Sequence, residues 1–157
     1  YIKDINIAPF PIPHDAADPV GFCFYYGNKK ISIATDLGHT NRRIINEISD
    51  SNVVVLEANH DIDMLSSGPY PQSLKRRIMG TRGHLSNMDA GKVAVDLVKG
   101  NVTHLLLAHL SKKNNIPKLA YDTVAHVLMS EGIVVGDDVV LDMTYRDRTG
   151  NVYHIDI

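Results

Sequence analysis

Lys30-Ile31-Ser32-Ile33-Ala34-Thr35-Asp36-Leu37-Gly38 alternates apolar residues up to a single carboxylate, and a glycine follows two residues later. The two-residue period of Ile31 and Ile33 predicts a β-strand with one apolar face. Asp36 stands where that strand ends, and Gly38 allows the backbone to turn. A carboxylate in this position suits a metal ligand or a catalytic base, and an Asp that only begins a turn gives the same pattern. The stretch alone leaves both interpretations open.

The segments on either side predict a mixed α/β fold. Residues 21–26 are rich in aromatic side chains, which favours a strand, and the Gly-Asn pair that follows is a hairpin signal leading into the Asp36 strand. Short apolar runs at residues 53–56 and 102–108 are typical of strands covered on both faces. Their alternation with helical patterns favours α/β layers in which helices flank a mixed sheet. Helices are expected over residues 41–49, 71–79, 86–99 and 117–131, a loop over 66–71, and a β-hairpin turning near 149–151 over 139–157.

Composition narrows the class of protein. The chain has 157 residues with 44% hydrophobic content, which is enough for one globular domain with a core. Because the net charge is −2, a nucleic-acid site would be a local patch and not a general basic field. Cys23 is the only cysteine, which excludes an intramolecular disulfide and a multi-cysteine zinc site and favours a reducing cytoplasm. No membrane span and no signal peptide are expected.

Polar side chains gather after the expected strands. Asp36, residues 57–61, His84 and His109 stand at or just past strand ends, and His14 precedes the first hairpin. Loops at the carboxyl ends of strands meet at one edge of such a sheet, so these residues can converge. Histidine with carboxylate is the ligand chemistry of zinc, manganese and iron hydrolases. A single histidine is more often a surface or core residue, and we assign no role to His39, His104, His126 and His154.

The order of these motifs resembles the second half of the metallo-β-lactamase fold. In that fold a histidine precedes a strand beginning Gly-aromatic, an Asp that bridges two metals ends a later strand, and a late strand ends in the last metal histidine. His14, Asp36 and His109 match these three positions. The loops Glu57-Ala58-Asn59-His60 and Gly83-His84-Leu85-Ser86 further resemble those of the nuclease branch that processes tRNA 3′ ends.

Four sequence motifs, spread in this order over nearly the whole chain, together resemble the WalJ/YycJ family of bacterial hydrolases. A 5′-to-3′ DNA exonuclease activity is attributed to that family. The motifs are His14-Asp15-Ala16-Ala17-Asp18-Pro19-Val20-Gly21, Glu57-Ala58-Asn59-His60-Asp61, Gly83-His84-Leu85-Ser86-Asn87 and His109-Leu110-Ser111-Lys112-Lys113-Asn114-Asn115.

The resemblance implies a two-metal hydrolase that acts on phosphodiesters. His14, Asp36 and His109 would hold two divalent ions, Zn or Mn with Fe as an alternative, and a metal-activated water would be the nucleophile. Asp36 and His84 would be the catalytic residues. The second loop of the resembling nucleases supplies a histidine close to the scissile phosphate, so His84 would stabilise the transition state or protonate the leaving oxygen.

Two further groups are candidates around this site. Asn59 and His60 would orient His84 or a metal ligand by hydrogen bonding, and a capped turn explains the pair equally well. Four basic residues lie between the two nuclease-like loops and would bind phosphates of DNA, which is expected in preference to RNA: Lys75, Arg76, Arg77 and Arg82. A solvated helix face is the alternative interpretation of the basic run.

The chain departs from the family pattern in one large respect. The signature His-x-His-x-Asp-His, which belongs to the first half of the fold, is absent. The resemblance therefore makes residues 1–157 the C-terminal part of a single metallo-β-lactamase-like domain. The missing half or a second copy would have to cover the other face of the sheet, and this chain alone is expected to be inactive.

Two other classes of function remain open at this point. A small-molecule metallohydrolase acting on a thioester, a lactone or a cyclic nucleotide would use the same fold. A non-catalytic interaction module would be consistent with half a site. The basic run and the Gly83-His84 loop favour a nucleic-acid phosphodiester over both.

Overall fold

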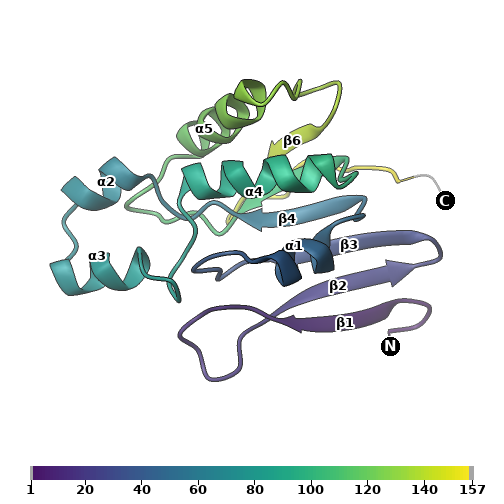
Figure 1. Ribbon diagram of the computed structural model, residues 1–157, viewed down its shortest axis with the longest axis horizontal. Helices are drawn as coiled ribbons and strands as arrows, with labels where there is room; N and C mark the ends of the chain where they lie inside the picture. The colour runs from purple at the N-terminus through teal and green to yellow at the C-terminus, as the bar shows by residue number, and fades with distance from the viewer. Residues whose placement is uncertain (1, 156–157) are drawn as a thin grey trace.

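The computed structural model describes residues 2–155 and shows a six-stranded mixed sheet with helices packed against it (Figure 1). The first three strands pair antiparallel, and the third to the sixth pair parallel. The α/β class with a mixed sheet, expected from the sequence, is confirmed. The strands lie side by side in chain order: β1 (Asn6–Pro11), β2 (Val20–Tyr26), β3 (Lys29–Ala34), β4 (Val53–Glu57), β5 (His104–Ala108) and β6 (Val140–Met143).

The helices divide into a covering layer and a pair at the end of the sheet. In Figure 1, α1 (Arg42–Ile48) and α4 (Asn87–Lys99) lie in front of the strands, with α5 (Pro117–Ser130) beside α4. The helices α2 (Ile62–Ser67) and α3 (Gln72–Ile78) lie beyond the end to which β4 points. Within residues 2–155, no helix is long and apolar enough to cross a membrane.

Helix boundaries follow the capping residues of the sequence. The Asn41 side chain accepts a hydrogen bond from the backbone N–H of Ile44 at the start of α1, and the Ser86 side chain accepts from that of Asp89 at the start of α4. Asp61 caps α2 in the same way, although the sequence pattern predicted only a loop after residue 66. This helix is a short one with a single buried side chain, so hydrophobic periodicity could not reveal it.

The C-terminal segment is not the β-hairpin that the sequence pattern predicted. β6 pairs in parallel with β5 and extends the sheet as its edge strand. The described residues after Met143 form no further strand. Side-chain hydrogen bonds, and not the backbone hydrogen bonds of a hairpin, connect this segment to β6: Asn151 and Tyr153 both donate to the Asp142 carboxylate. Residues 156 and 157 of the expected hairpin lie outside the described residues.

The two faces of the sheet differ in cover. The helices bury Cys23, Ala34 and Leu56, whose side chains are 0% exposed. The opposite face carries apolar side chains that the strand registers align in rows, and we call it the open face: Phe22, Phe24, Ile31, Ile33, Val55 and Leu106. Phe22 is 38% exposed and Ile31 is 40% exposed. Such a continuous apolar surface is typical of an interface.

Two glycines allow the loops at the end of the sheet to pack closely. A Cβ on Gly38 would lie 2.3 Å from the Thr81 carbonyl oxygen, and a Cβ on Gly83 would lie 2.1 Å from the Ile78 carbonyl oxygen. Gly38 is therefore required for close approach and not for a left-handed turn. Asp36 itself adopts the left-handed conformation, with φ of 61°.

Candidate metal centre

The parallel strands bring three polar residues to one edge of the sheet. The register pairs Ala34 of β3 with Leu56 of β4, so Asp36 lies just past the position beside Glu57. Glu57 in turn pairs with Ala108 of β5, the residue before His109. Adjacent parallel strands thus deliver Asp36, Glu57 and His109 side by side at their carboxyl ends, where ligand sites of open α/β sheets form.

Four side chains form a compact donor group at this edge: Asp36, Glu57, His84 and His109, each offering one ligand atom, with all these atoms within 4.8 Å of one another. Asp36 Oδ1 lies 3.9 Å from His84 Nδ1 and 3.8 Å from His109 Nδ1. His14 adjoins the group, with its Nε2 3.7 Å from Asp36 Oδ1 and its ring centroid 5.0 Å from that of His84. The structure therefore brings together His14, Asp36, His84 and His109.

Glu57 is the buried centre of the group, with 0% exposure. Its Oε1 accepts hydrogen bonds from His84 Nδ1 at 2.8 Å and from His109 Nδ1 at 2.6 Å. Its Oε2 accepts from the backbone N–H groups of Leu37 at 2.7 Å and Leu85 at 3.3 Å. A carboxylate has about four lone-pair sites, and all are used here. Glu57 is thus a hydrogen-bond partner of the two histidines and not a free metal ligand.

Glu57 belongs to one of the loop motifs in the sequence, and no role was predicted for it. The signal was present, because a carboxylate at the last position of a buried apolar strand needs partners. What the sequence alone lacked was the register, which places Glu57 between the Asp36 and His109 strands.

The charge of Glu57 fixes the tautomers of its neighbours. Burial raises the pKa of the Glu57 carboxyl, but the hydrogen bonds from His109 and His84 outweigh burial, and the pKa lies below its ordinary value. The hydrogen bond to Glu57 raises the pKa of His109 against the opposing effect of burial. An ionised carboxylate only accepts, so both histidines donate through Nδ1–H.

Among the described residues, none of the three imidazoles has a hydrogen bond at its second ring nitrogen, and His14 Nε2 lies 3.5 Å from Asp15 Oδ1. His14 donates through Nδ1 to the Gly83 carbonyl oxygen at 3.1 Å, as His84 and His109 do to Glu57. A ring that is oriented through one nitrogen and has the other available is typical of metal-binding histidine. Together with the Asp36 carboxylate, these imidazoles form a donor set that fits a divalent ion of the zinc, manganese and iron group.

Two of the donors stand on a strained backbone. Asp36 and His109 adopt left-handed φ angles of 61° and 58°, which non-glycine residues adopt rarely and which cluster at functional sites. Hydrogen bonds to residues distant in the sequence hold both positions: the N–H of Leu37 donates to Glu57, and Asn59 Nδ2 donates to the His109 carbonyl oxygen at 2.9 Å. Asn59 thus holds the main chain of His109, and an orienting role for Asn59 toward the His84 or His109 side chain stays a prediction.

His60 differs from Asn59. It is 2% exposed, and its Nδ1 has no hydrogen-bond partner among the described residues. Burial lowers the pKa of His60, with the charge of Glu57 opposing that shift. Because no hydrogen bond joins His60 to His84 in the described part of the chain, we give it no further part in the site.

The basic residues predicted to bind phosphate have different environments. Lys75 is 5% exposed, and its ammonium donates to the Ser66 carbonyl oxygen at 2.6 Å, so it stabilises the end of α2. Arg76 is exposed on α3. We therefore leave Lys75 out of the proposals below.

The two other arginines fix the loop that carries His14. Arg82 donates through Nε and Nη2 to the His14 carbonyl oxygen at 3.2 and 3.1 Å. Arg77 forms a two-bond ion pair with Asp15, and the Arg77 hydrogen bond lowers the pKa of Asp15 to about 2. The Arg77 side chain is still 59% exposed. Both arginines thus link α3 and its following loop to the candidate metal centre.

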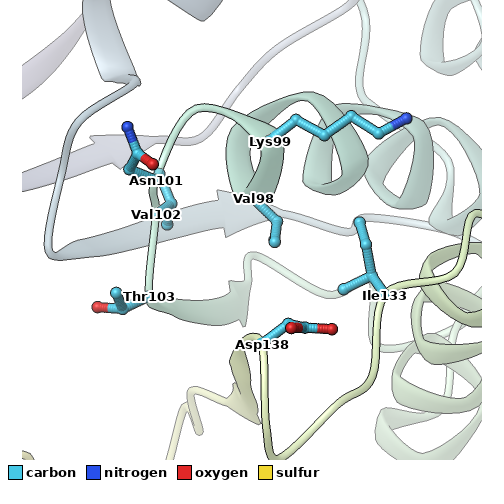
Figure 2. A pocket seen from close by; sticks show the side chains of 7 residues that line it. All are labelled: Val98, Lys99, Asn101, Val102, Thr103, Ile133 and Asp138. Carbon is cyan, nitrogen blue, oxygen red and sulfur yellow. The ribbon is translucent and has the colours of Figure 1, made fainter.

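A separate cavity of about 450 Å³ lies away from the donor group (Figure 2). It is lined by residues at the end of α4, in the turn before β5 and before β6, and therefore lies at the amino ends of the parallel strands: Val98, Lys99, Asn101, Val102, Thr103, Ile133 and Asp138. The lining holds no histidine or cysteine, and Lys99 is paired with Glu131. This cavity has none of the chemistry of the opposite edge.

Replacing Glu57 with glutamine is expected to lower the free energy of unfolding by about 1–3 kcal/mol. Glutamine has one acceptor oxygen, so its NH2 group must face either two imidazole N–H groups or two backbone N–H groups. Chemical denaturation of the metal-free full-length protein measures the change. Glu131→Gln, which alters an exposed ion pair, should stay within about 0.5 kcal/mol of wild type. Equal effects of the two substitutions would contradict the central position of Glu57.

Known proteins resemble this chain in sequence and in fold. No family model matches the chain. The chain is 40% identical over 134 residues to "Exodeoxyribonuclease YycJ" of Bacillus anthracis, which covers 85% of this chain and 51% of that protein. It is 36% identical over 135 residues to "Exodeoxyribonuclease WalJ" of Streptococcus pneumoniae, covering 86% of this chain and 50% of that protein. The chain spans about half the length of these relatives.

Solved structures show the same fold. The metallo-β-lactamase fold protein YhfI of Bacillus subtilis matches with a TM-score of 0.64 at 13% identity, over 92% of this chain and 47% of that chain. Zinc-bound PqqB of Methylobacterium extorquens matches with a TM-score of 0.63 at 15% identity, over 96% of this chain and 52% of that chain. At these identities the likeness concerns the fold, and the matched part is about half of each structure.

Proposed function

We propose that this chain, a metallo-β-lactamase fold protein related to the YycJ and WalJ exodeoxyribonucleases over 85% of its length, supplies part of the active site of a metal-dependent DNA exonuclease. The reaction is hydrolysis of terminal phosphodiester bonds, with the 5′-to-3′ polarity that the family resemblance implies. One observation carries the proposal: Asp36, His14, His84 and His109 gather at the carboxyl edge of the sheet, each imidazole with one nitrogen available.

The residues of this chain divide into metal ligands and a histidine for the substrate. His14, Asp36 and His109, with further ligands from the rest of the fold, would hold two divalent ions, Zn or Mn with Fe as an alternative. Such ions lower the pKa of a bound water and neutralise charge on a phosphoryl group. The open Nε2 positions of His14 and His109 and the carboxylate of Asp36 support this assignment.

His84 is proposed to act on the phosphodiester itself. Its Nδ1–H is committed to Glu57, so in the imidazolium form Nε2–H is the group that would donate a proton or a hydrogen bond to the leaving oxygen. Glu57 would stabilise the charge on the ring while its own carboxylate remains buried and paired. The arrangement is that of an acid oriented by a carboxylate, which keeps the ring in one tautomer.

The rest of the fold is proposed to come from a preceding half of the same domain. The chain covers about half of its sequence relatives and about half of the matching structures. The open face is an apolar surface that a second layer of the fold would bury. Residues 1–157 would then be the C-terminal part of one domain, and a second copy of the chain is the alternative cover.

The test uses the full-length protein and DNA labelled at one end. We expect nucleotides to be released from the 5′ end in Mn²⁺ or Zn²⁺, no release after chelation, and recovery when metal is added back. Hydrolysis that persists in excess chelator would contradict the metal-dependent reaction. Faster turnover of a thioester, a lactone or a cyclic nucleotide than of DNA would contradict the substrate.

A further inference from the structure

We infer that Asn115, paired with Asn87, is a positioning residue that fixes His84 against Glu57, an inference that rests on the proposed function for the reaction that His84 serves. Both asparagines are buried, Asn87 with 1% exposure and Asn115 with 6%. They belong to the sequence motifs that contain His84 and His109, and no role was predicted for either. Asn87 is the first residue of α4, and Asn115 lies just before α5.

The two side-chain amides bind each other reciprocally. Asn87 Nδ2 donates to Asn115 Oδ1 at 2.9 Å, and Asn115 Nδ2 donates to Asn87 Oδ1 at 2.8 Å. Because each hydrogen bond prefers a nearly linear geometry, two opposed bonds fix the rotation of the amide planes as well as their separation. Water does not compete for these atoms, since the pair is buried, so the bonds are stronger than they would be at the surface.

Asn115 is also the better connected of the two. Its Nδ2 donates a second hydrogen bond to the Ala58 carbonyl oxygen at 2.9 Å, and its Oδ1 accepts from the backbone N–H of Ile116 at 2.9 Å. An amide has two donor hydrogens and an oxygen with two lone pairs, and Asn115 uses all of them. A fully satisfied buried polar network specifies a single arrangement of the groups that it joins.

The network joins the main chain beside Glu57 to the main chain beyond His84. Ala58 follows Glu57 directly, and Asn87 lies three residues after His84. Asn115 donates to both, so one side chain from the loop after β5 sets the distance between the end of β4 and the start of α4.

His84 depends on this connection more than His109 does. His109 directly follows β5, whose pairing with β4 continues to the position beside Glu57. His84 lies in the loop between α3 and α4 and has no strand to hold it. A small shift of the start of α4 would therefore lengthen the 2.8 Å hydrogen bond from His84 Nδ1 to Glu57 and turn the imidazole away from the leaving oxygen.

Steady-state kinetics of the full-length protein on end-labelled DNA test this role. Asn115→Ala should lower kcat about 10- to 100-fold and leave KM and the bound metal nearly unchanged, because it misplaces His84 and not the proposed metal ligands. Asn114→Ala is the matched control. It truncates the neighbouring amide, which is 0% exposed and donates to Ser111 Oγ at 3.4 Å, and it should keep the kcat of wild type. A fall in kcat only in proportion to lost metal would overturn the inference.

The Nδ1–H proton of His84 gives a readout that does not depend on turnover. In metal-free full-length protein with isotope-labelled histidine, a ring proton bound to a buried carboxylate is protected from exchange and gives a resolved signal, which His84→Ala assigns. Asn115→Ala should abolish this signal through exchange with water and retain that of His109. Asn114→Ala should retain both. A His84 signal that is unchanged in Asn115→Ala would overturn the inference.

Asn87→Ala breaks the same pair from α4, keeps the bond from Asn115 to Ala58, and gives a second comparison if Asn115→Ala does not fold. Failure of both variants to fold would also overturn the inference, because the pair would then hold the whole domain and not the position of His84. If wild type hydrolyses no DNA but Asn115→Ala loses the His84 signal, the proposed reaction is wrong and the positioning role stands. If wild type hydrolyses DNA and Asn115→Ala keeps both kcat and the signal, the positioning role alone is wrong.

Discussion

Replacing His84 with alanine in the full-length protein is expected to lower the turnover of DNA by about 10²- to 10⁴-fold and to leave the bound metal nearly unchanged. The reason is that His84 and the metal ligands have different proposed roles at the sheet edge. His84 enters from the loop before α4 and shares the Glu57 oxygen with His109, but only the strand-end residues and His14 are assigned to the metals. Metal analysis together with single-turnover rates measures the two effects separately.

His109→Ala is the matched comparison. In the wild type, Glu57 binds the His109 imidazole and Asn59 binds the His109 carbonyl oxygen. Because the substitution removes that oriented imidazole, the variant should lose metal and activity together. His126→Ala, on the exposed side of α5, should change neither. Equal metal loss in the His84 and His109 variants would show that His84 is a ligand, which the spacing of the four-residue donor group permits.

The Asp36 strand shows what sequence alone can predict. The alternation of Ile31 and Ile33 predicted the strand. The carboxylate at its end indicated the edge of the sheet at which the site forms, because parallel strands end at the same edge. The site also required residues up to 95 positions apart in a known order, and the family resemblance supplied that order. His14, Asp36 and His109 were placed at the same edge for this reason.

Glu57 and Lys75 show that the sequence does not predict whether a charged side chain is buried. A carboxylate or an ammonium has the same appearance in sequence whether it is buried or solvated. Glu57 proved to be the saturated acceptor at the centre of the site, and Lys75 to be buried against the end of α2. β6 is a similar case, because an apolar strand near the C-terminus can pair with its successor or with β5, and only the packing of the whole sheet selects β5.

The same limit applies to the surface that Lys112, Lys113 and Arg146 share. Lys112 and Lys113 were part of a family motif, and Arg146 follows the last strand, so 33 positions separate Lys113 from Arg146 in the sequence. Nothing in their spacing indicates a shared surface. The parallel pairing of β5 and β6 brings the loops after these strands together, and the hydrogen bond from Arg146 to Leu110 fixes them there.

Residues 1–157 produced alone are expected to self-associate, to bind metal weakly and to cleave no DNA. The helices bury one face of the sheet, while Phe22 and Ile31 on the open face remain 38% and 40% exposed in aligned rows of apolar side chains. Burying such a surface is favourable by about 25 cal/mol per Å² of apolar area, so another copy would occupy it when the rest of the fold is absent. Three ligands are also too few for two ions.

A charge placed on the open face separates this cause from general instability. Ile31→Lys should shift the isolated chain toward the monomer, because the open face would no longer bury its apolar rows, whereas Val134→Lys adds the same charge at a side chain that is 51% exposed and lies outside that face. Light scattering gives the mass, elemental analysis the metal content, and the end-labelled DNA assay the activity. A monomeric wild-type chain that holds two metal ions and cleaves DNA would contradict the proposal that a second half completes both the core and the site.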